Sequence, residues 1–343
     1  MKRIALVLSI TTLLASTLSA PTEVAAVVDT TYVGSAASVT GGSCADPDFS
    51  TLESSIDVAL AAAISAVDTD GDTIVICNGT YRYEASIAWI EQANDFSIVA
   101  EDRGAVTLDG TGAYGLISVG GASLLTIEGL RFTRAGDTGA IYRPAGNLMV
   151  VDSEFIANNK SEESAPGSGF GGGAINGDAG CEYSHQIEDS VFRSNTGPTG
   201  AVSTCSLEVV GSTFVNNKTT RSGGALYVCD LSVADSYFAG NSALLDGGAI
   251  DACVIIDMDD NRFIHNSTPQ YGGAIAVDDP MVEPGRWTGN SFVANRARSG
   301  GAIFMGCRPA NGRELIASIN RRNRLHGNSR GGAVFDRRNE CVR

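Results

Sequence analysis

Aspartates are the side chains of this sequence best suited to chemistry. Asp152, Asp189, Asp235 and Asp260 each stand three residues before a phenylalanine. Asp235 and Asp260 fall in neighbouring copies of one pattern, so we expect their carboxyls about 5 Å apart, as in retaining glycosidases. The same position is acidic in several copies, however. That regularity favours a structural row of turn residues over a catalytic pair.

Asp278 and Asp279 depart from the pattern and are the stronger catalytic candidates. Asp278 lies four residues after Ala274, where the preceding copies carry cysteine. A residue that interrupts a repeated position can mark a functional site. Arg262 and Arg286 are the nearest cations in the sequence and the candidates for a basic role.

Calcium is the cofactor that these acidic residues would suit. Asp251, Asp257 and Asp259 lie near Asp278 and Asp279 in the repeat, and Ca²⁺ prefers several carboxylate oxygens. The sequence therefore predicts an acidic patch that can hold calcium. The alternative is that residues 274–290, which contain two prolines, form an outward loop.

The stretch "DTDGDT" is a second calcium candidate, through Asp68, Asp70 and Asp72. It lacks the full EF-hand spacing and the bidentate glutamate at the twelfth place. An aspartate-rich turn that leads into a strand is the competing interpretation.

Other catalytic classes lack their residues. The histidines share no position in the repeat, so we interpret them as surface or turn residues; they are His185, His265 and His326. No nucleophile elbow, phosphate loop or HExxH motif is present. These observations favour a protein that is not an enzyme.

Two alternating motifs organise most of the chain. Gly-Gly-Ala-aliphatic copies, two of them weaker, place alanine at 140, 174, 201, 225, 249, 274, 302 and 333. Phe-x-x-Asn copies lie between them. Their phenylalanines are Phe155, Phe192, Phe214, Phe238, Phe263 and Phe292, and their asparagines are Asn158, Asn195, Asn217, Asn241, Asn266 and Asn295. A period of this length indicates stacked units that share one core.

The segments between the motifs are short and rich in Val, Ile, Ser and Phe, which is typical of strands. Each period is therefore one coil of a parallel β-helix, and we expect about ten coils spaced about 4.8 Å apart. Phe would stack on Phe inside and Asn on Asn at a turn. An apolar stripe over residues 50–67 predicts a helix that caps the N-terminal end, begun by a Ser50/Glu53 capping box.

The eight cysteines indicate disulfides in an exported protein. Cys181, Cys205, Cys229 and Cys253 are spaced 24 residues apart, so they should stack within disulfide distance in successive coils. We predict Cys181–Cys205 and Cys229–Cys253, with Cys205–Cys229 as the competing pairing. Cys44–Cys77 and Cys307–Cys341 would join the remaining four.

The first residues resemble a secretory signal. A basic start, an apolar run and Val24-Ala25-Ala26 predict a signal peptide over residues 1–26 and a secreted or cell-surface protein. A linker over 27–43, a cap with the first coils over 44–127 and the repeat β-helix with its C-terminal cap over 128–343 would follow. No second apolar run is long enough to span a membrane, so we expect no integral membrane segment after cleavage.

Charge is unevenly spread. Residues 1–285 carry a balance of −24 and residues 286–343 one of +9, within a net charge of −15. The basic residues near the C-terminus have little aromatic interleaving, which argues against a nucleic-acid partner. Contact with an anionic glycan or envelope surface is one interpretation, and a solvated end of a rod is the other.

The paired motifs resemble those of the polymorphic outer-membrane protein family, over about residues 128–335. The segment "GDTIVICNGTY" also resembles the start of bacterial pectate-lyase-like β-helix proteins. The resemblance implies an all-β, right-handed parallel β-helix solenoid with an N-terminal α-helical cap.

The functional expectation is an adhesin-like protein that binds polysaccharide, cell-envelope glycan or another cell-surface protein. The alternative is a calcium-assisted polysaccharide lyase or a glycoside hydrolase. In a pectate-lyase-like enzyme, calcium would neutralise a uronate and Arg or Lys would act as the base.

Overall fold

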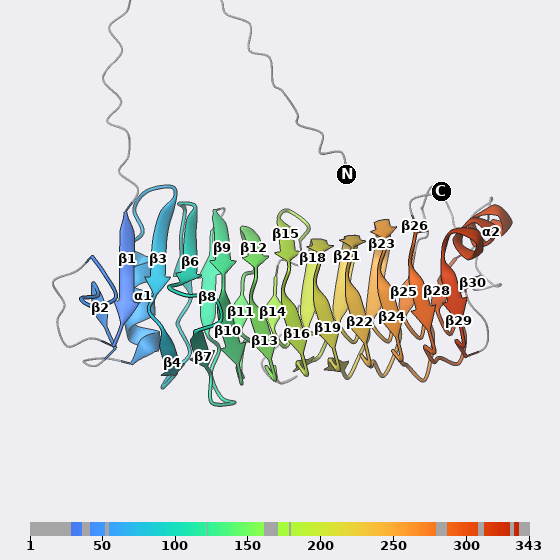
Figure 1. Ribbon diagram of the computed structural model, residues 1–343, viewed down its shortest axis with the longest axis horizontal. Helices are drawn as coiled ribbons and strands as arrows, with labels where there is room; N and C mark the ends of the chain where they lie inside the picture. Colours follow the sequence, from blue (N-terminus) through green and yellow to red (C-terminus); the bar gives the residue numbers. More distant parts are fainter. Residues whose placement is uncertain are drawn as a thin grey trace, which may run out of the picture.

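The computed structural model describes residues 29–35, 42–51, 55–121, 123–160, 171–177, 180–278, 287–307, 312–329 and 333–335. The predicted signal peptide lies outside these residues. The described chain winds into a right-handed parallel β-helix, a long rod with the first coils at one end and the last coils at the other (Figure 1). The predicted fold class is therefore confirmed.

One side of the rod is a ten-stranded parallel sheet, with one strand from each coil. We call it the Phe sheet, because its strands carry the motif phenylalanines. Its strands are β4 (Gly79–Arg82), β7 (Val106–Asp109), β10 (Leu130–Thr133), β13 (Glu154–Ile156), β16 (Val191–Arg193), β19 (Thr213–Val215), β22 (Tyr237–Ala239), β24 (Arg262–Ile264), β27 (Ser291–Val293) and β29 (Arg324–His326).

An eighteen-stranded sheet, with strands of two to ten residues, forms the rest of the wall of the rod in the described part of the chain. In the early coils it comprises β1 (Thr30–Gly34), β2 (Phe49–Ser50), β3 (Asp72–Ile76), β5 (Ile90–Glu91), β6 (Phe96–Ala100), β8 (Ile117–Gly120), β9 (Leu124–Glu128), β11 (Ile141–Tyr142) and β12 (Asn147–Val151). It continues with β14 (Ile175–Asn176), β15 (Ser184–Glu188), β18 (Val202–Val210), β21 (Leu226–Ala234), β23 (Ile250–Asp259), β25 (Ile275–Val277), β26 (Trp287–Thr288), β28 (Ile303–Met305) and β30 (Ala333–Phe335).

Within this sheet, the strand segments that directly follow the Gly-Gly-Ala copies make one face, which we call the GGA face. It consists of β11, β14, the starts of β18, β21 and β23, and then β25, β28 and β30. A two-stranded sheet of β17 (Thr196–Gly197) and β20 (Lys218–Thr219) lies at a turn beyond the Phe sheet.

The motif phenylalanines fill the interior as one stack. Neighbouring rings from Phe132 to Phe292 have centroids 4.6–4.9 Å apart and planes within 8° of parallel. The six motif rings are fully buried. This is the predicted ladder, and its regularity follows from the identical register of successive strands in the Phe sheet.

The motif asparagines form a second interior ladder at the turn after each Phe strand. Each side-chain Nδ2 donates to Oδ1 of the asparagine one coil later at 3.0 Å. The ladder runs through Asn158, Asn195, Asn217, Asn241, Asn266 and Asn295, which are all buried as the motif predicts, and it ends at Asn328.

Each ladder asparagine also bonds to the backbone of the coil before its own. The Nδ2 of Asn195, for example, donates to the carbonyl of Phe155 at 2.9 Å and to Oδ1 of Asn217 at 3.0 Å. The backbone N–H of Asn195 donates to the same oxygen of Asn217 at 2.9 Å. The buried turn therefore has its polar groups paired.

A third ladder was not predicted from the sequence. It occupies the position two residues before each motif phenylalanine, where backbone N–H groups donate to the side chain of the next coil. Its members are Ser153, Ser190, Ser212, Ser236, Asn261, Asn290 and Asn323. The preceding aspartates at 152, 189, 235 and 260 all have positive φ, which supports a turn role for them.

The helix α1 (Ile56–Ala66) caps the N-terminal end and contacts β1, β2 and β5. Its apolar stripe is buried as predicted, but the predicted start is wrong. Ser50 belongs to β2 and the N-cap is Ser55, which makes no side-chain capping hydrogen bond. A second helix, α2 (Gly312–Arg322), was not predicted; it contacts β26, β29 and β30 at the other end and buries Leu315 and Ile319.

Disulfides join Cys44 to Cys77 and Cys181 to Cys205, with Cα atoms 5.4 and 4.9 Å apart. The predicted Cys229–Cys253 bond is not formed, although the two sulfurs lie 2.8 Å apart. Register brings these thiols together, but bond formation also requires oxidation, which register does not determine. Cys307 is disulfide-bonded, and its predicted partner Cys341 lies outside the described residues.

Candidate functional site

Asp278 lies where its spacing predicts, directly beyond β25 on the GGA face. Its backbone N–H donates to the carbonyl of Ala252 at 3.0 Å, and Ala252 is in register with Val277. Asp278 therefore follows Cys253 in the column formed by Cys205, Cys229 and Cys253. The carboxylate replaces a thiol at the next position of that column.

Two further aspartates approach Asp278 on the GGA face. Asp251 is in register with Tyr227 of the preceding coil and Ala276 of the following coil. Asp246 immediately precedes the Gly-Gly of the same coil and bridges to Tyr271. We call Asp246, Asp251 and Asp278 the acidic cluster.

The acidic cluster favours protonated carboxyls. Burial raises the pKa of Asp251 to about 7; a hydrogen bond from Ser222 opposes the rise, and the charges of Asp278 and Asp246 add to it. Burial also raises the pKa of Asp246 and that of Asp278. A carboxyl that holds its proton near neutral pH can serve as a general acid.

The other predicted catalytic residues do not join this cluster. Arg262 lies on β24 of the Phe sheet, with its guanidinium 5.9 Å from the centre of the Tyr237 ring. The structure therefore does not bring Arg262 and Asp278 together. Asp279 and Arg286 lie outside the described residues.

The aspartates of residues 68–72 serve a turn. Both carboxylate oxygens of Asp72 accept hydrogen bonds from backbone N–H groups, and the hydroxyl of Thr69 donates at 2.6 Å. Asp70 accepts from the backbone N–H of Asp95 at 3.0 Å. Among the described residues, the sets of three metal-ligand side chains that lie within reach of one another involve cysteines and Glu101, not these aspartates.

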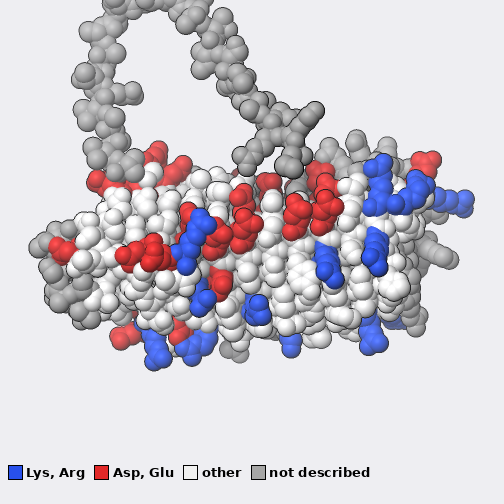
Figure 2. Space-filling view, viewed as in Figure 1, with Lys and Arg blue, Asp and Glu red and all other residues white. Residues whose placement is uncertain are grey.

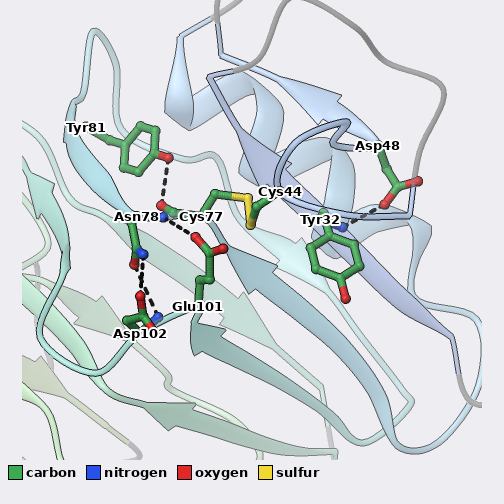
Figure 3. The surroundings of a disulfide bond; sticks show 8 residues. All are labelled: Tyr32, Cys44, Asp48, Cys77, Asn78, Tyr81, Glu101 and Asp102. Carbon is green, nitrogen blue, oxygen red and sulfur yellow. Dashed lines mark hydrogen bonds between the residues drawn. A yellow bond between two sulfur atoms is a disulfide. The ribbon is translucent and has the colours of Figure 1, made fainter.

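One of those sets consists of Glu101 and the two cysteines of the Cys44–Cys77 disulfide (Figure 3). Its sulfurs are bonded to each other and so are not thiolate ligands. Glu101 accepts a hydrogen bond from the backbone N–H of Asn78 at 2.9 Å, and Asn78 donates to Asp102 at 2.6 Å. The hollow of about 310 Å³ beside them is therefore bordered by groups that hold the first coils together.

One predicted surface histidine is buried. His185 on β15 is 1% exposed, and its Nδ1 lies 2.8 Å from the hydroxyl of Thr204. His265 has positive φ at an exposed turn, and His326 is exposed on β29. The sequence carried no indication that His185 points inward, because the loop before it has no counterpart in the next coils.

A groove of about 600 Å³ runs along the rod at the turn after the asparagine ladder. The residue that follows each ladder asparagine stands in register with its equivalents, and these residues form what we call the groove row. Its members are Thr196, Lys218, Ser242, Ser267 and Arg296. Leu244, which is 57% exposed, also lines the groove.

The surface is electrostatically divided (Figure 2). On the face shown, acidic side chains gather in a band along the rod; basic side chains cluster at the C-terminal end and also occur singly near the middle and along the lower edge. Arg321 and Arg322 on α2 and Arg324 on β29 are exposed at the C-terminal end. None of the described residues that line the groove is acidic.

Comparison with known proteins matches the repeat. A family model described as the Chlamydia polymorphic membrane protein repeat matches residues 211–229, which include Phe214, Asn217 and Gly223-Gly224-Ala225. The resemblance inferred from the motifs is thus confirmed for this copy. No curated protein sequence matches the chain. None of the helices in the described part of the chain has the length and apolarity needed to cross a bilayer.

Three solved structures of family PL6 lyases are similar to the chain. Alginate lyase AlyGC has 12% identity and a TM-score of 0.41, with 90% of this chain and 38% of that one covered. A PL6 alginate lyase in complex with trisaccharide has 15% identity and a TM-score of 0.41, with 80% of this chain and 64% of that one covered. Lyase Pedsa3628 from Pseudopedobacter saltans has 13% identity and a TM-score of 0.24, over 82% and 91%. At TM-scores below 0.5 these similarities carry no argument.

Proposed function

We propose that this protein is an exported, surface-associated β-helix that binds an anionic polysaccharide along the groove. The observation that carries the proposal is the groove row, in which two serine hydroxyls stand between the ammonium of Lys218 and the guanidinium of Arg296 over four successive coils. The proposed binding is non-enzymatic and adhesin-like.

The spacing of the groove row suits a linear polymer. Its side chains recur about every 4.8 Å along the rod, because each comes from the same position of one coil. Ser242 and Ser267 can both donate and accept hydrogen bonds, as sugar hydroxyls can. Leu244 offers an apolar contact beside them, suited to the carbon-bound face of a sugar ring.

Charge favours an anionic polymer over a neutral one. Lys218 and Arg296 are exposed, and no acidic side chain is among the described residues that line the groove. The chain as a whole carries −15, so an anion is repelled by much of the surface and is attracted locally to these two cations. Such a site selects where on the rod the polymer lies.

An exported location supports this role. The predicted signal peptide is followed by a chain with disulfides, which persist in oxidising compartments. The matched repeat comes from a membrane protein family of Chlamydia. Binding at a cell surface would give each of these features a use.

The test is retention of the full chain on immobilised polyuronate, sulfated glycan and neutral glucan. We expect binding to the anionic polymers and a dissociation constant about five- to thirtyfold higher in Lys218→Ala/Arg296→Ala, since exposed charge contacts contribute about 0.5–1 kcal/mol each. The matched control is Arg321→Ala/Arg322→Ala, which removes the same charge from α2. Loss of binding in the control alone would move the site to the C-terminal end and contradict the proposal.

Glycoside hydrolysis is a second candidate, favoured by the acidic cluster. Asp251 holds a proton near neutral pH beside two further carboxyls, and a glycosidase needs one carboxylic acid and one carboxylate. Release of reducing ends from a polysaccharide panel by the wild type, lost in Asp251→Asn, would support it. Turnover that is unchanged in Asp251→Asn would exclude the cluster as its source.

A further inference from the structure

Four cysteines form a column on the rod that contains one disulfide and two thiols. The disulfide joins Cys181 to Cys205, and Cys229 and Cys253 continue the column in the next two coils. The strand register fixes this arrangement, because the residues on both sides of Cys205, Cys229 and Cys253 are paired coil to coil. The column is therefore built into the sheet.

The sulfurs of the column lie within reach of one another. The Sγ atoms of Cys181, Cys205 and Cys229 all lie within 4.8 Å of each other, and those of Cys229 and Cys253 are 2.8 Å apart. Equivalent positions of successive coils follow the rod axis. The sulfur of Cys229 therefore lies within reach of the Cys181–Cys205 disulfide, as thiol–disulfide exchange requires.

Proton placement distinguishes the two thiols. Cys253 donates its S–H to the sulfur of Cys229. Burial raises the pKa of Cys253 to about 12, and the hydrogen bond to Cys229, the charge of Cys229 and the carboxylates of Asp278 and Asp251 add to the rise. Cys253 therefore keeps its proton. Cys229 is the thiol next to Cys205 in the column, and so it is the one placed to attack the disulfide.

We propose that this column is a thiol–disulfide exchange site in which the disulfide moves between coils. The thiolate of Cys229 attacks the sulfur of Cys205, a Cys205–Cys229 bond forms as the Cys181–Cys205 bond breaks, and the electron pair leaves on Cys181. Cys181 then takes a proton from water. The exchange consumes no oxidant and no reductant.

Burial determines where the exchange meets the solvent. Cys205 is fully buried, so an external thiol cannot reach it. Cys181 is exposed in the loop between β14 and β15. When the disulfide moves from Cys181–Cys205 to Cys205–Cys229, Cys181 becomes a thiol at the surface. The new bond contains the buried Cys205 sulfur, which external thiols cannot reach.

A second exchange completes the column. Once Cys253 loses its proton, it can attack Cys229, form Cys229–Cys253 and release Cys205 as a thiol. This product contains the pairing that the 24-residue spacing predicts from the sequence. The Cys181–Cys205 bond seen in the structure and the predicted Cys229–Cys253 bond are thus the first and last of three exchanging states, with Cys205–Cys229 between them.

The test maps disulfides in the folded, full-length protein with no reductant added, because the column already holds two thiols. Samples held at pH 8 are quenched with acid, alkylated, and digested under acid to prevent later exchange. Mass spectrometry should find a peptide linked through Cys205–Cys229 and alkylation at Cys181. The rate of its appearance should fall about tenfold per pH unit below the thiol pKa.

Two variants separate exchange from incomplete oxidation. Cys229→Ser should abolish the Cys205–Cys229 peptide and leave Cys181 unalkylated, whereas Cys253→Ser should retain both. The Cys44–Cys77 bond is the internal control and should not exchange with the column. Absence of both the Cys205–Cys229 peptide and alkylation at Cys181 in the wild type, under all these conditions, would overturn the proposal.

Discussion

The side-chain amide of Asn241 donates a hydrogen bond to Oδ1 of Asn266, 3.0 Å away in the next coil. Asn241 also donates to the carbonyl of Phe214 and accepts from the backbone and side-chain nitrogens of Asn217. It is fully buried. One side chain therefore satisfies polar groups in the coils on both sides of its own.

Replacing Asn241 by alanine should destabilise the protein by about 2–4 kcal/mol, because buried donors and acceptors lose their partners. Urea unfolding followed by circular dichroism would measure the change. Asn328→Ala is the matched control, since Asn328 ends the described ladder and is only half-buried. Equal losses in the two variants would contradict the ladder's role.

Phe238 should be sensitive to volume. Its ring lies 4.9 Å from that of Phe214 and 4.8 Å from that of Phe263, and it is fully buried. We expect Phe238→Ala to cost about 3–5 kcal/mol and Phe238→Leu about 1–2 kcal/mol. Denaturant midpoints at constant slope would give both values, and the opposite order would argue against a packed stack.

Gly247 and Gly104 test the tight corner of the Gly-Gly-Ala motif. Both have positive φ, at 61° and 73°. A Cβ at Gly247 would meet the backbone of Ile250, whereas one at Gly104 would meet nothing within 4 Å. Gly104→Ala should therefore cost about 1–2 kcal/mol from backbone strain alone, and Gly247→Ala about 1–3 kcal/mol more. Thermal unfolding of the two variants would measure both losses of stability. Equal losses would show that the corner at Gly247 can accommodate a Cβ.

Stability should fall as pH rises from about 4 to about 7. The pKa of Asp251 is about 7 in the fold and about 3.9 unfolded, so between these values the folded state holds the extra proton. The contribution of protonated Asp251 is complete below the lower value and is lost as pH passes the upper one.

The melting temperature of Asp251→Asn relative to wild type should therefore increase from pH 4 to pH 7. Circular dichroism melts at several pH values would measure it. A part of the slope should remain, because the pKa values of Asp246 and Asp278 are raised in the same direction. Asp230→Asn, at an exposed position on β21, should follow the wild type. Parallel curves for Asp251→Asn and wild type would contradict the assigned pKa.

The repeat allowed the buried core to be predicted from the sequence. It did not allow the acidic cluster or the groove to be predicted in full. Phe214, Phe238 and Phe263 share one position in the motif, and one position in a coil has one environment. The third ladder, two residues before each phenylalanine, could have been predicted in the same way. It was missed because the residue type changes along the ladder, from Ser236 to Asn261 in the next coil.

The acidic cluster depends on a departure from the repeat, whereas the groove row occupies a regular position whose residue type changes from coil to coil. The spacing located Asp278 beside the cysteine column, yet Asp246 and Asp251 join it through the turn at Gly247-Gly248. The turn brings Asp246 and Asp251 onto one face of the rod. The period of the repeat predicts which residues stack between coils, but not which residues meet across a turn within one coil. The helix α2 escaped prediction for a related reason, since it replaces repeat residues in the last coils.

Strict coil-to-coil register also determines how the rod can change in length. Strands pair with their equivalents one coil away, and the Gly-Gly-Ala alanines at 201, 225 and 249 recur every 24 residues. A duplicated block of that length would bring its own phenylalanine, asparagine and glycines into line with both neighbours. Each duplication would extend the molecule by about 4.8 Å, so its length can grow by gene duplication in whole-coil steps, with the contacts at the insertion replaced by equivalent ones.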